Sequence, residues 1–156
     1  MIFVYILIGL IFFAGDFLSK RYILSNVALV ETFGSLTPLI DFTYVQNRGA
    51  AFSILSGKIN FLALISILFC IGLIIFVIIK KPKNKLLCIS LAMIFSGALG
   101  NAIDRLFYGF VVDFIETTFV DFAVFNIADI GITVGAFLLA IYVIFFDRET
   151  RSEQKE

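Results

Sequence analysis

Long hydrophobic stretches alternate with short polar segments along this chain of 156 residues. A helix of about 20 apolar residues crosses the roughly 30 Å hydrocarbon layer of a bilayer. The pattern predicts an all-α membrane protein with four transmembrane helices, in which residues 1–156 form a single polytopic membrane domain. The four predicted helices cover about residues 2–20, 60–80, 86–107 and 127–146.

The segment between the first two helices, about residues 22–58, has a different pattern. Apolar and polar residues alternate through Phe42 and Tyr44 until Val45 breaks the phase, and an Asn-Arg-Gly turn signal follows at 47–49. Such alternation is typical of half-buried strands, and turn residues bound them. We therefore expect a small strand-rich lobe on the outer, extracytoplasmic side of the membrane.

The composition agrees with a membrane protein and excludes several kinds of chemistry. Hydrophobic residues make up 61% of the chain, against about 45–50% in an ordinary soluble domain. Twelve Lys and Arg balance twelve Asp and Glu, so no basic field indicates a nucleic-acid partner. Because the chain has no His, Ser-His catalysis, Cys-His catalysis and HExxH zinc sites are excluded.

Positive charges predict the orientation of the chain in the membrane. Residues 80–85 hold four Lys, and the C-terminal tail adds Arg148, Arg151 and Lys155. Short cytoplasmic segments carry an excess of Lys and Arg, so we expect both termini and the 80–85 loop in the cytoplasm. The first helix lacks the basic start and the small-residue cleavage site of a signal peptide, and we expect it to be retained.

Polar residues within the predicted helices fall at one depth. At about 1.5 Å of rise per residue, four of them lie roughly 21–27 Å from the cytoplasmic ends of their helices. Ionisable groups inside membrane helices are costly, and they face a protein interior or a water-filled cavity. The shared depth predicts one polar site near the outer face, covered by the strand-rich lobe. The four residues are Asp16, Asn101, Asp104 and Asp129.

Two acids differ from the others in their neighbours. Asp113 and Asp129 have no Lys or Arg within four residues and lie among apolar side chains. Two unpaired carboxyl groups in one pocket can share a proton, which is the state that aspartic proteases use to activate water. Two other acids have a cation beside them, which favours a structural role. These expected pairs are Asp16–Lys20 and Asp104–Arg105.

Five short segments, in order along nearly the whole chain, resemble those of bacterial lipoprotein signal peptidase, also called signal peptidase II. Each segment is weak alone, but together with four helices of this length they are specific. The resemblance implies a membrane-embedded aspartyl endopeptidase. It would remove the signal peptide from diacylglyceryl-modified prolipoproteins by cleaving before the lipid-modified cysteine. The segments are DFLSK at 16–20, NRGAAFS at 47–53, GALGNAIDR at 97–105, VVDF at 111–114 and FNIAD at 125–129.

The resemblance also implies roles for individual residues. Asp113 and Asp129 would form the catalytic pair, and Asn126 would support Asp129. Phe17 and Ser96 depart from the family pattern, where Gln and a second Gly are common, but these positions concern helix packing more than the pair. The residues that would bind substrate or support the site are Asp16, Lys20, Asn47, Gly97, Asn101, Asp104 and Arg105.

The same resemblance implies partners and a location. We expect signal peptides of lipid-modified prolipoproteins and membrane lipid as partners, and no nucleic acid. We expect no cofactor and no metal, since dispersed carboxylates without His offer no evident metal site. The protein would be a monomer in the bacterial cytoplasmic membrane, with its active site near the outer face.

Other classes of protein remain open from the residues alone. A proton-coupled transporter component also carries carboxylates in membrane helices. A metal-dependent lipid-head-group phosphotransferase could hold Mg²⁺ on the acids near residues 101–113. A Ser-Lys peptidase could pair Lys20 with Ser19, Ser53 or Ser56, although adjacent helix residues point to different faces. A non-enzymatic scaffold would give the two unpaired acids no purpose.

Overall fold

A computed structural model describes residues 2–50 and 54–146 of the chain. Four residues singled out in the sequence lie outside the described residues, namely Ser53, Arg148, Arg151 and Lys155. The helices and strands are, in chain order, α1 (Ile2–Asn26), β1 (Thr32–Thr37), β2 (Ile40–Asn47), α2 (Ile59–Lys80), α3 (Lys85–Tyr108), β3 (Val111–Thr117) and α4 (Ile127–Phe145).

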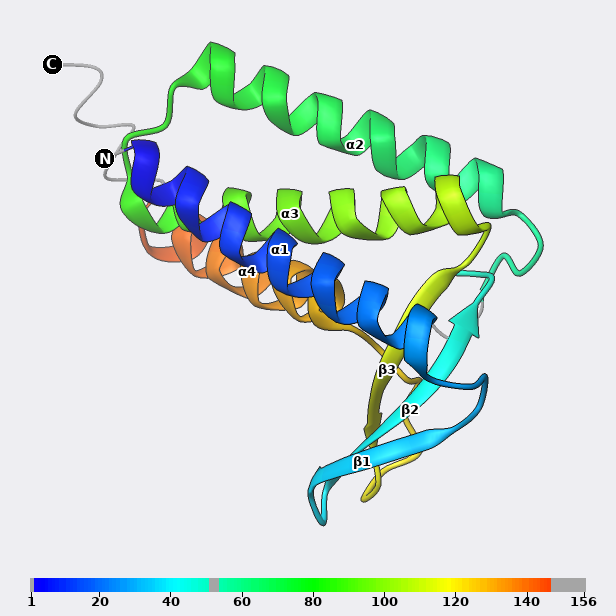
Figure 1. The fold of residues 1–156 in the computed structure, drawn as a ribbon. Coiled ribbons are helices and arrows are strands. Elements are labelled where there is room, and N and C mark those ends of the chain that lie inside the picture. Colours follow the sequence, from blue (N-terminus) through cyan, green and yellow to red (C-terminus); the bar gives the residue numbers. More distant parts are fainter. Residues whose placement is uncertain (1, 51–53, 147–156) are drawn as a thin grey trace, which may run out of the picture.

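The central helix is α3, which packs against α1, α2 and α4 (Figure 1). Small residues let α3 and α4 approach closely. A Cβ atom on Gly97 of α3 would clash with the backbone oxygen of Ala128, and one on Gly135 of α4 would lie 2.9 Å from the backbone oxygen of Ser90. Close backbone approach through small residues is typical of helix pairs in membranes.

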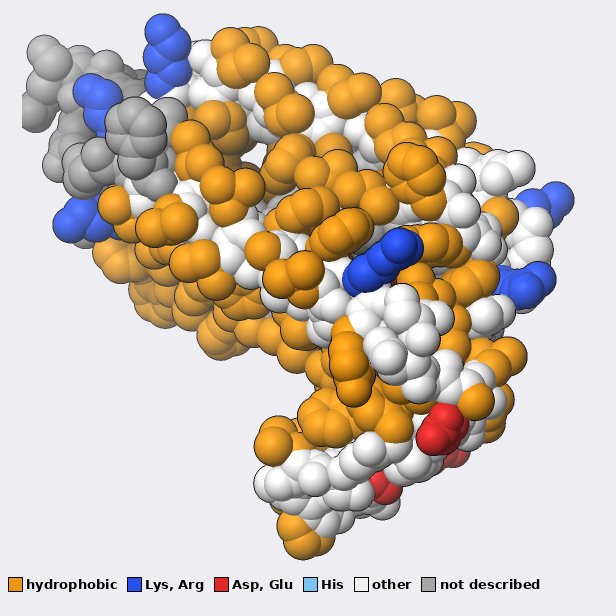
Figure 2. Space-filling model, in the orientation of Figure 1, with side chains coloured by type: hydrophobic (Ala, Val, Ile, Leu, Met, Phe, Trp, Pro, Cys, Tyr) orange, Lys and Arg blue, Asp and Glu red, His pale blue; other side chains and the backbone are white. Residues whose placement is uncertain are grey.

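Three helices, α2, α3 and α4, are long and apolar enough to cross a membrane, judged over the described residues. The expected fourth span, α1, is not among them, so the expectation of four transmembrane helices is not confirmed. Most side chains on the visible face of the helices are hydrophobic (Figure 2). An exposed apolar surface this extensive is typical of a region that contacts lipid.

The three strands form one antiparallel sheet, in the order β1-β2-β3, beyond one end of the helices (Figure 1). This sheet differs from the expected lobe of residues 22–58 in two ways. Residues 22–26 continue α1, and the third strand follows α3 in the chain. The break in alternation seen in the sequence coincides with a register irregularity between Phe42 and Val45, and Val45 pairs with Asp113.

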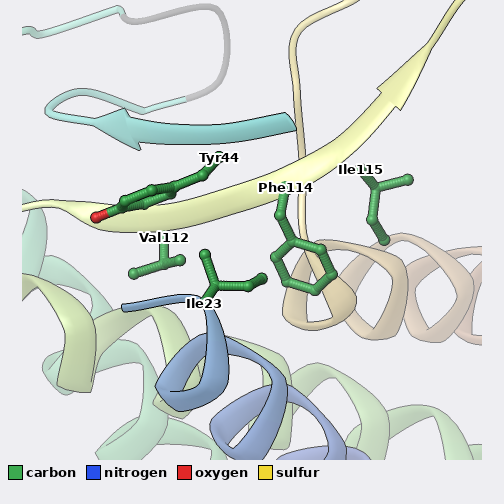
Figure 3. Packing of buried hydrophobic residues seen from close by; sticks show 5 residues of the cluster. All are labelled: Ile23, Tyr44, Val112, Phe114 and Ile115. Atoms are coloured by element: carbon green, nitrogen blue, oxygen red, sulfur yellow. The ribbon is translucent and has the colours of Figure 1, made fainter. Parts of the chain in front are cut away.

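An apolar cluster joins the sheet to the end of α1. Ile23 of α1 and Tyr44 of β2 are buried together with three residues of β3 (Figure 3). Val112 and Phe114 point toward α1 in this cluster, and side chains alternate along a strand. Asp113, between them, is therefore directed to the opposite side. The third β3 residue of the cluster is Ile115.

Candidate active site

Asp113 is held in β3 by two amide donors, with only 2% of its surface exposed. Asn47, the last residue of β2, donates from Nδ2 to Asp113 Oδ2 at 3.0 Å. Asn126 donates from Nδ2 to Asp113 Oδ1 at 2.6 Å. The pairing of Asn47 with Val111 in the sheet brings its amide to this carboxyl group. Both carboxyl oxygens therefore have a partner.

The pKa of Asp113 is raised from 3.8 to about 7. Burial is the largest cause, and the negative charge of Asp129 acts in the same direction. The hydrogen bonds from Asn47 and Asn126 lower the pKa, because they favour the charged form. Near pH 7 this carboxyl group exists in both protonation states, so it can donate a hydrogen bond as well as accept one.

Asp129 lies in the first turn of α4, where it forms a capping box with the N-cap residue Asn126. The N–H of Asp129 donates to Asn126 Oδ1 at 2.9 Å, and the N–H of Asn126 donates to Asp129 Oδ2 at 3.2 Å. Asn101 of α3 donates from Nδ2 to Asp129 Oδ1 at 2.8 Å. A helix N-terminus stabilises a negative charge, and the Asp129 carboxyl group lies in the first turn of α4.

The chain folds back after β3, and this return brings Asp113 and Asp129 to one side of the sheet and helices. The N–H of Phe125 donates to the carbonyl of Ile115 at 3.0 Å, and the N–H of Ile115 donates back at 2.8 Å. This return places Asn126 between the carboxyl groups, with its side chain bonded to Asp113 and its backbone bonded to Asp129. Both acids line one cavity of about 500 Å³.

A buried ion cluster lies beside this pair. The Lys20 ammonium lies 2.8 Å from Asp16 Oδ2 and 3.0 Å from Asp104 Oδ2, and it donates to Asn101 Oδ1 at 2.9 Å. The expected Asp16–Lys20 pair is present. The expected Asp104–Arg105 pair is not found among the described residues, because adjacent helix positions face different directions and Asp104 turns to Lys20 instead.

Backbone donors complete the cluster. The N–H of Ala128 donates to Asp16 Oδ1 at 2.8 Å, and the N–H of Val112 donates to Asp104 Oδ2 at 3.1 Å. The cluster therefore ties α1 to the start of α4, and α3 to β3. Sequence reasoning missed these two donors, since a backbone N–H has no signature in the residue type.

Comparison with known proteins identifies the family. The sequence profile of the family described as Signal peptidase (SPase) II matches residues 8–145. The chain belongs to the signal peptidase II family. The lipoprotein signal peptidase of Clostridium acetobutylicum is 40% identical over 135 residues, which cover 85% of this chain and 88% of that protein. The lipoprotein signal peptidase of Lactobacillus johnsonii is 38% identical over 145 residues, which cover 93% and 94%.

Solved structures agree with this assignment. A bacterial membrane enzyme solved by the in meso method at 2.3 Å has a TM-score of 0.85 and 37% identity, over 90% of this chain and 87% of that one. A second such structure, at 1.9 Å, has a TM-score of 0.82 and 37% identity, over 92% and 94%. The resemblance found in the sequence is confirmed. The comparisons support a peptidase, and neither the transporter nor the phosphotransferase.

Arg105 extends the site of this signal peptidase II chain toward the loop after β2. Its guanidinium donates from Nη1 to the carbonyl of Asn101 and from Nη2 to the carbonyl of Gly49, each at 3.3 Å. Its Nε is buried and has no hydrogen-bond partner among the described residues. Arg105 lines the same cavity as the two acids, so a cation faces the space between the sheet and the helices.

Gly97 lies where α3 meets the first turn of α4. Any side chain there would clash with the backbone oxygen of Ala128, the residue before Asp129, so this glycine sets how close α4 comes to α3. Ser96, where a second glycine is common, is buried and donates its hydroxyl to the carbonyl of Met93 at 2.9 Å. Phe17 is 45% exposed, which agrees with a position outside the pair.

A second cavity of about 540 Å³ adjoins the first between α2, α3 and α4. The polar residues that line both cavities are Asn101, Arg105 and Asp129. Apolar side chains such as Phe69 and Leu139 line the second cavity away from the acids. The polar site therefore continues into an apolar space among the helices. No motif in the sequence predicted this cavity, because its apolar lining residues are of the same types as the many apolar residues elsewhere in the helices.

The serines considered from the sequence do not pair with Lys20 in the part of the chain that is described. The Ser19 hydroxyl donates to the carbonyl of Asp16 at 2.9 Å. Ser56 lies on an exposed turn, and Ser53 falls outside the described ranges. Within the same ranges, no group of three or more His, Cys, Asp or Glu residues could hold a metal ion.

Proposed function

We propose that the chain is an aspartyl endopeptidase that removes the signal peptide from diacylglyceryl-modified prolipoproteins, cleaving before the lipid-modified cysteine. Asp113 and Asp129 form its catalytic pair. One observation carries the proposal: Asn126 bonds Asp113 through its side chain and Asp129 through its backbone, and both carboxyl groups line one cavity. Relatives at about 40% identity, which carry the name lipoprotein signal peptidase, support the choice of substrate.

The surroundings of the two acids favour a division of labour. Asp129, at the start of α4, acts as general base and takes a proton from water as the water oxygen bonds to the scissile carbonyl carbon. The protonated form of Asp113, whose pKa is raised to about 7, donates a hydrogen bond to the carbonyl oxygen and stabilises its developing charge. When the C–N bond breaks, Asp129 returns its proton to the leaving amine of the cysteine.

The remaining polar residues support this pair. Asn47 and Asn101 orient one carboxyl group each. Arg105 borders both cavities, and it positions the substrate backbone between them. Gly97 keeps α4 close to α3. The ion cluster of Asp16, Lys20 and Asp104 fixes the helices around the site. No residue in this scheme needs a metal or a cofactor.

The proposed topology has four transmembrane helices, with α1 as the fourth, in a single domain and a monomeric protein. The loop between α2 and α3 carries Lys80, Lys81, Lys83 and Lys85, and it lies at the end of the helices away from the sheet (Figure 1). The positive charges assign this end, and both termini, to the bacterial cytoplasm. The sheet and the active site then face outward, at the level where acyl chains hold a lipid-modified substrate.

The test replaces each acid with its amide. Asp113→Asn and Asp129→Asn should each abolish cleavage of a diacylglyceryl-modified precursor peptide in detergent while the protein remains folded. Asp121→Asn is the matched control, because Asp121 is an exposed acid on the segment that joins β3 to α4. The enzyme should leave an unmodified precursor uncut and should keep its activity with a chelator present. Full activity in either pair variant would exclude the proposed pair.

A further inference from the structure

The Lys20 ammonium has three N–H donors, and three side-chain oxygens lie around it. These are Asp16 Oδ2 at 2.8 Å, Asp104 Oδ2 at 3.0 Å and Asn101 Oδ1 at 2.9 Å. Lys20 is only 2% exposed, so water does not compete for these positions. The two carboxylates form ion pairs with the ammonium. The ammonium also donates a hydrogen bond to the uncharged amide of Asn101, which in turn donates to Asp129.

The donors around Asn101 determine how its amide is turned. Lys20 and the Asn126 Nδ2 group can only donate, and both point to Asn101 Oδ1, at 2.9 Å and 3.2 Å. The NH₂ of Asn101 must therefore lie on the other side, where it donates to Asp129 Oδ1 at 2.8 Å. A turned amide would set an oxygen against the Asp129 carboxylate and an NH₂ against the ammonium, two unfavourable contacts.

Other neighbours cannot give Asn101 this orientation as firmly as Lys20. The Asn126 NH₂ has two hydrogens and three acceptors, and its shortest bond, at 2.6 Å, goes to Asp113. Arg105 bonds the backbone carbonyl of Asn101 and leaves the side chain alone. Lys20 is therefore the donor that determines the orientation of the Asn101 side-chain oxygen.

We propose that Lys20 is a positioning residue for the Asp129 carboxylate and acts through the amide of Asn101. Its ammonium fixes the Asn101 oxygen, so the Asn101 NH₂ faces Asp129 and holds that carboxylate where it meets the attacking water. This inference rests on the proposed function, since it assigns Asp129 the role of general base. Lys20 therefore has a role in positioning that its ion-pair partners, Asp16 and Asp104, do not share, since those two acids only connect the helices.

The test must remove Lys20 without leaving two uncompensated buried acids. In an Asp16→Asn reference, the further change Lys20→Met removes the ammonium and leaves the cluster with the same net charge as in the unaltered protein. The asparagine can still accept from the Ala128 N–H. Four proteins are compared: the Asp16→Asn reference, and the reference with Lys20→Met, with Asn101→Ala, and with both changes.

We expect Lys20→Met to lower kcat by about 10²-fold in this reference, the size of effect that follows from misplacing a catalytic group by about 1 Å, with KM changed less than about 3-fold. With Asn101→Ala present, Lys20→Met should lower kcat by less than about 3-fold, because the path through Asn101 is already lost. Thermal unfolding in detergent reports whether each protein is folded.

Equal effects of Lys20→Met with and without Asn101 would overturn the inference and leave Lys20 a purely structural ion-pair partner. If the Lys20 variants do not fold, Asn101→Asp carries the test, because it keeps an acceptor for Lys20 and sets an oxygen against Asp129. Its kcat should be no higher than that of Asn101→Ala, and a higher value would overturn the inference. The proposed function fails separately, through activity in Asp113→Asn or Asp129→Asn.

Discussion

α2 and α3 are alike by sequence and differ in what they do. Both are long and apolar enough to cross a membrane. α3 buries twelve residues, Asn101 and Asp104 among them, whereas α2 buries three, all of them apolar. Hydrophobicity brings a helix into the bilayer, where lipid tails are as apolar as leucine. The placement of small and polar residues decides which helix organises a site.

The largest effect should come from Asn126, where α4 begins against α3. Asn126→Ala removes the side-chain donor to Asp113 and the acceptor for the N–H of Asp129. We expect kcat/KM on a lipid-modified precursor peptide to fall by about 10²-fold to 10³-fold, the cost of losing one donor at an active site. Loss of the cap should also lower the free energy of unfolding by about 1–2 kcal/mol.

Asn84→Ala is the matched control at the far end of α3. Asn84 is the N-cap of α3 and accepts from the N–H groups of Leu86 and Leu87 at 2.9 Å and 3.2 Å. Its loss should lower the free energy of unfolding by a similar amount, because a cap is lost in both variants. The cleavage rate should stay within about 2-fold of that of the unaltered chain. Similar activity in the two variants would show that Asn126 acts only as a cap.

The next comparison adds one methyl group to each helix, at a glycine of α3 and at a glycine of α2. Gly97→Ala on α3 would push against the backbone oxygen of Ala128 and move the first turn of α4. Such overpacking costs about 1–3 kcal/mol of stability, and the shift of Asp129 should lower kcat by about 10-fold to 10²-fold. Initial rates at saturating substrate, with thermal unfolding alongside, measure both effects.

Gly72→Ala on α2 is the counterpart, because a Cβ there meets nothing within 4 Å. This variant should be neutral or more stable, by up to about 1 kcal/mol, since alanine has the higher helix propensity. Its activity should equal that of the unaltered chain. A loss of activity at Gly72 as large as that at Gly97 would contradict the division between the two helices.

The features that could be predicted from the sequence are those that lie within one segment of the chain. Four helices follow from apolar runs, and the gathering of polar residues follows from counting depth along each run. The family follows from short segments that carry Asp113, Asn126 and Asp129. These inferences depend on spacing within one segment of chain, where the helical rise converts residue number into distance.

Contacts between segments that are distant in the sequence could not be predicted from residue spacing. Nothing near residues 111–117 shows that this strand would pair with β2, because a short apolar run does not name its partner. Asp104 has Arg105 next to it in sequence, and yet it pairs with Lys20 of α1. The rotation of each helix decides such pairs, and it is set by packing at positions such as Gly97.

The site at the end of α3 should also reduce stability in a pH-dependent way. The pKa of Asp113 is about 7 in the folded protein, against an ordinary value of 3.8 for an aspartate side chain in water. Between these values the folded state holds a proton that the unfolded state has lost, so stability falls as pH rises through this window. Asp113→Asn should therefore be more stable than the unaltered chain at pH 8, by about 1–3 kcal/mol.

The advantage of Asp113→Asn should shrink as the pH is lowered from 8 to 5, where the native carboxyl group is protonated in the fold. Unfolding temperatures in detergent at several pH values measure this difference. Asp121→Asn alters an exposed carboxyl group, so its difference from the unaltered chain should stay nearly constant across the same range. A constant advantage for Asp113→Asn would mean that the buried carboxyl group does not titrate in this window.

The smallest effect should come from the lipid-facing side of α2. Leu68 is 57% exposed, while Leu91 of α3 is 7% exposed. In a bilayer a leucine gains little by moving from lipid to protein, so only lost packing counts against its truncation. Leu68→Ala should change the free energy of unfolding by less than about 0.5 kcal/mol, whereas Leu91→Ala should cost about 2 kcal/mol through the cavity it leaves. Unfolding in a detergent titration measures both, and equal costs would mean that α2 has a protein partner on its exposed face.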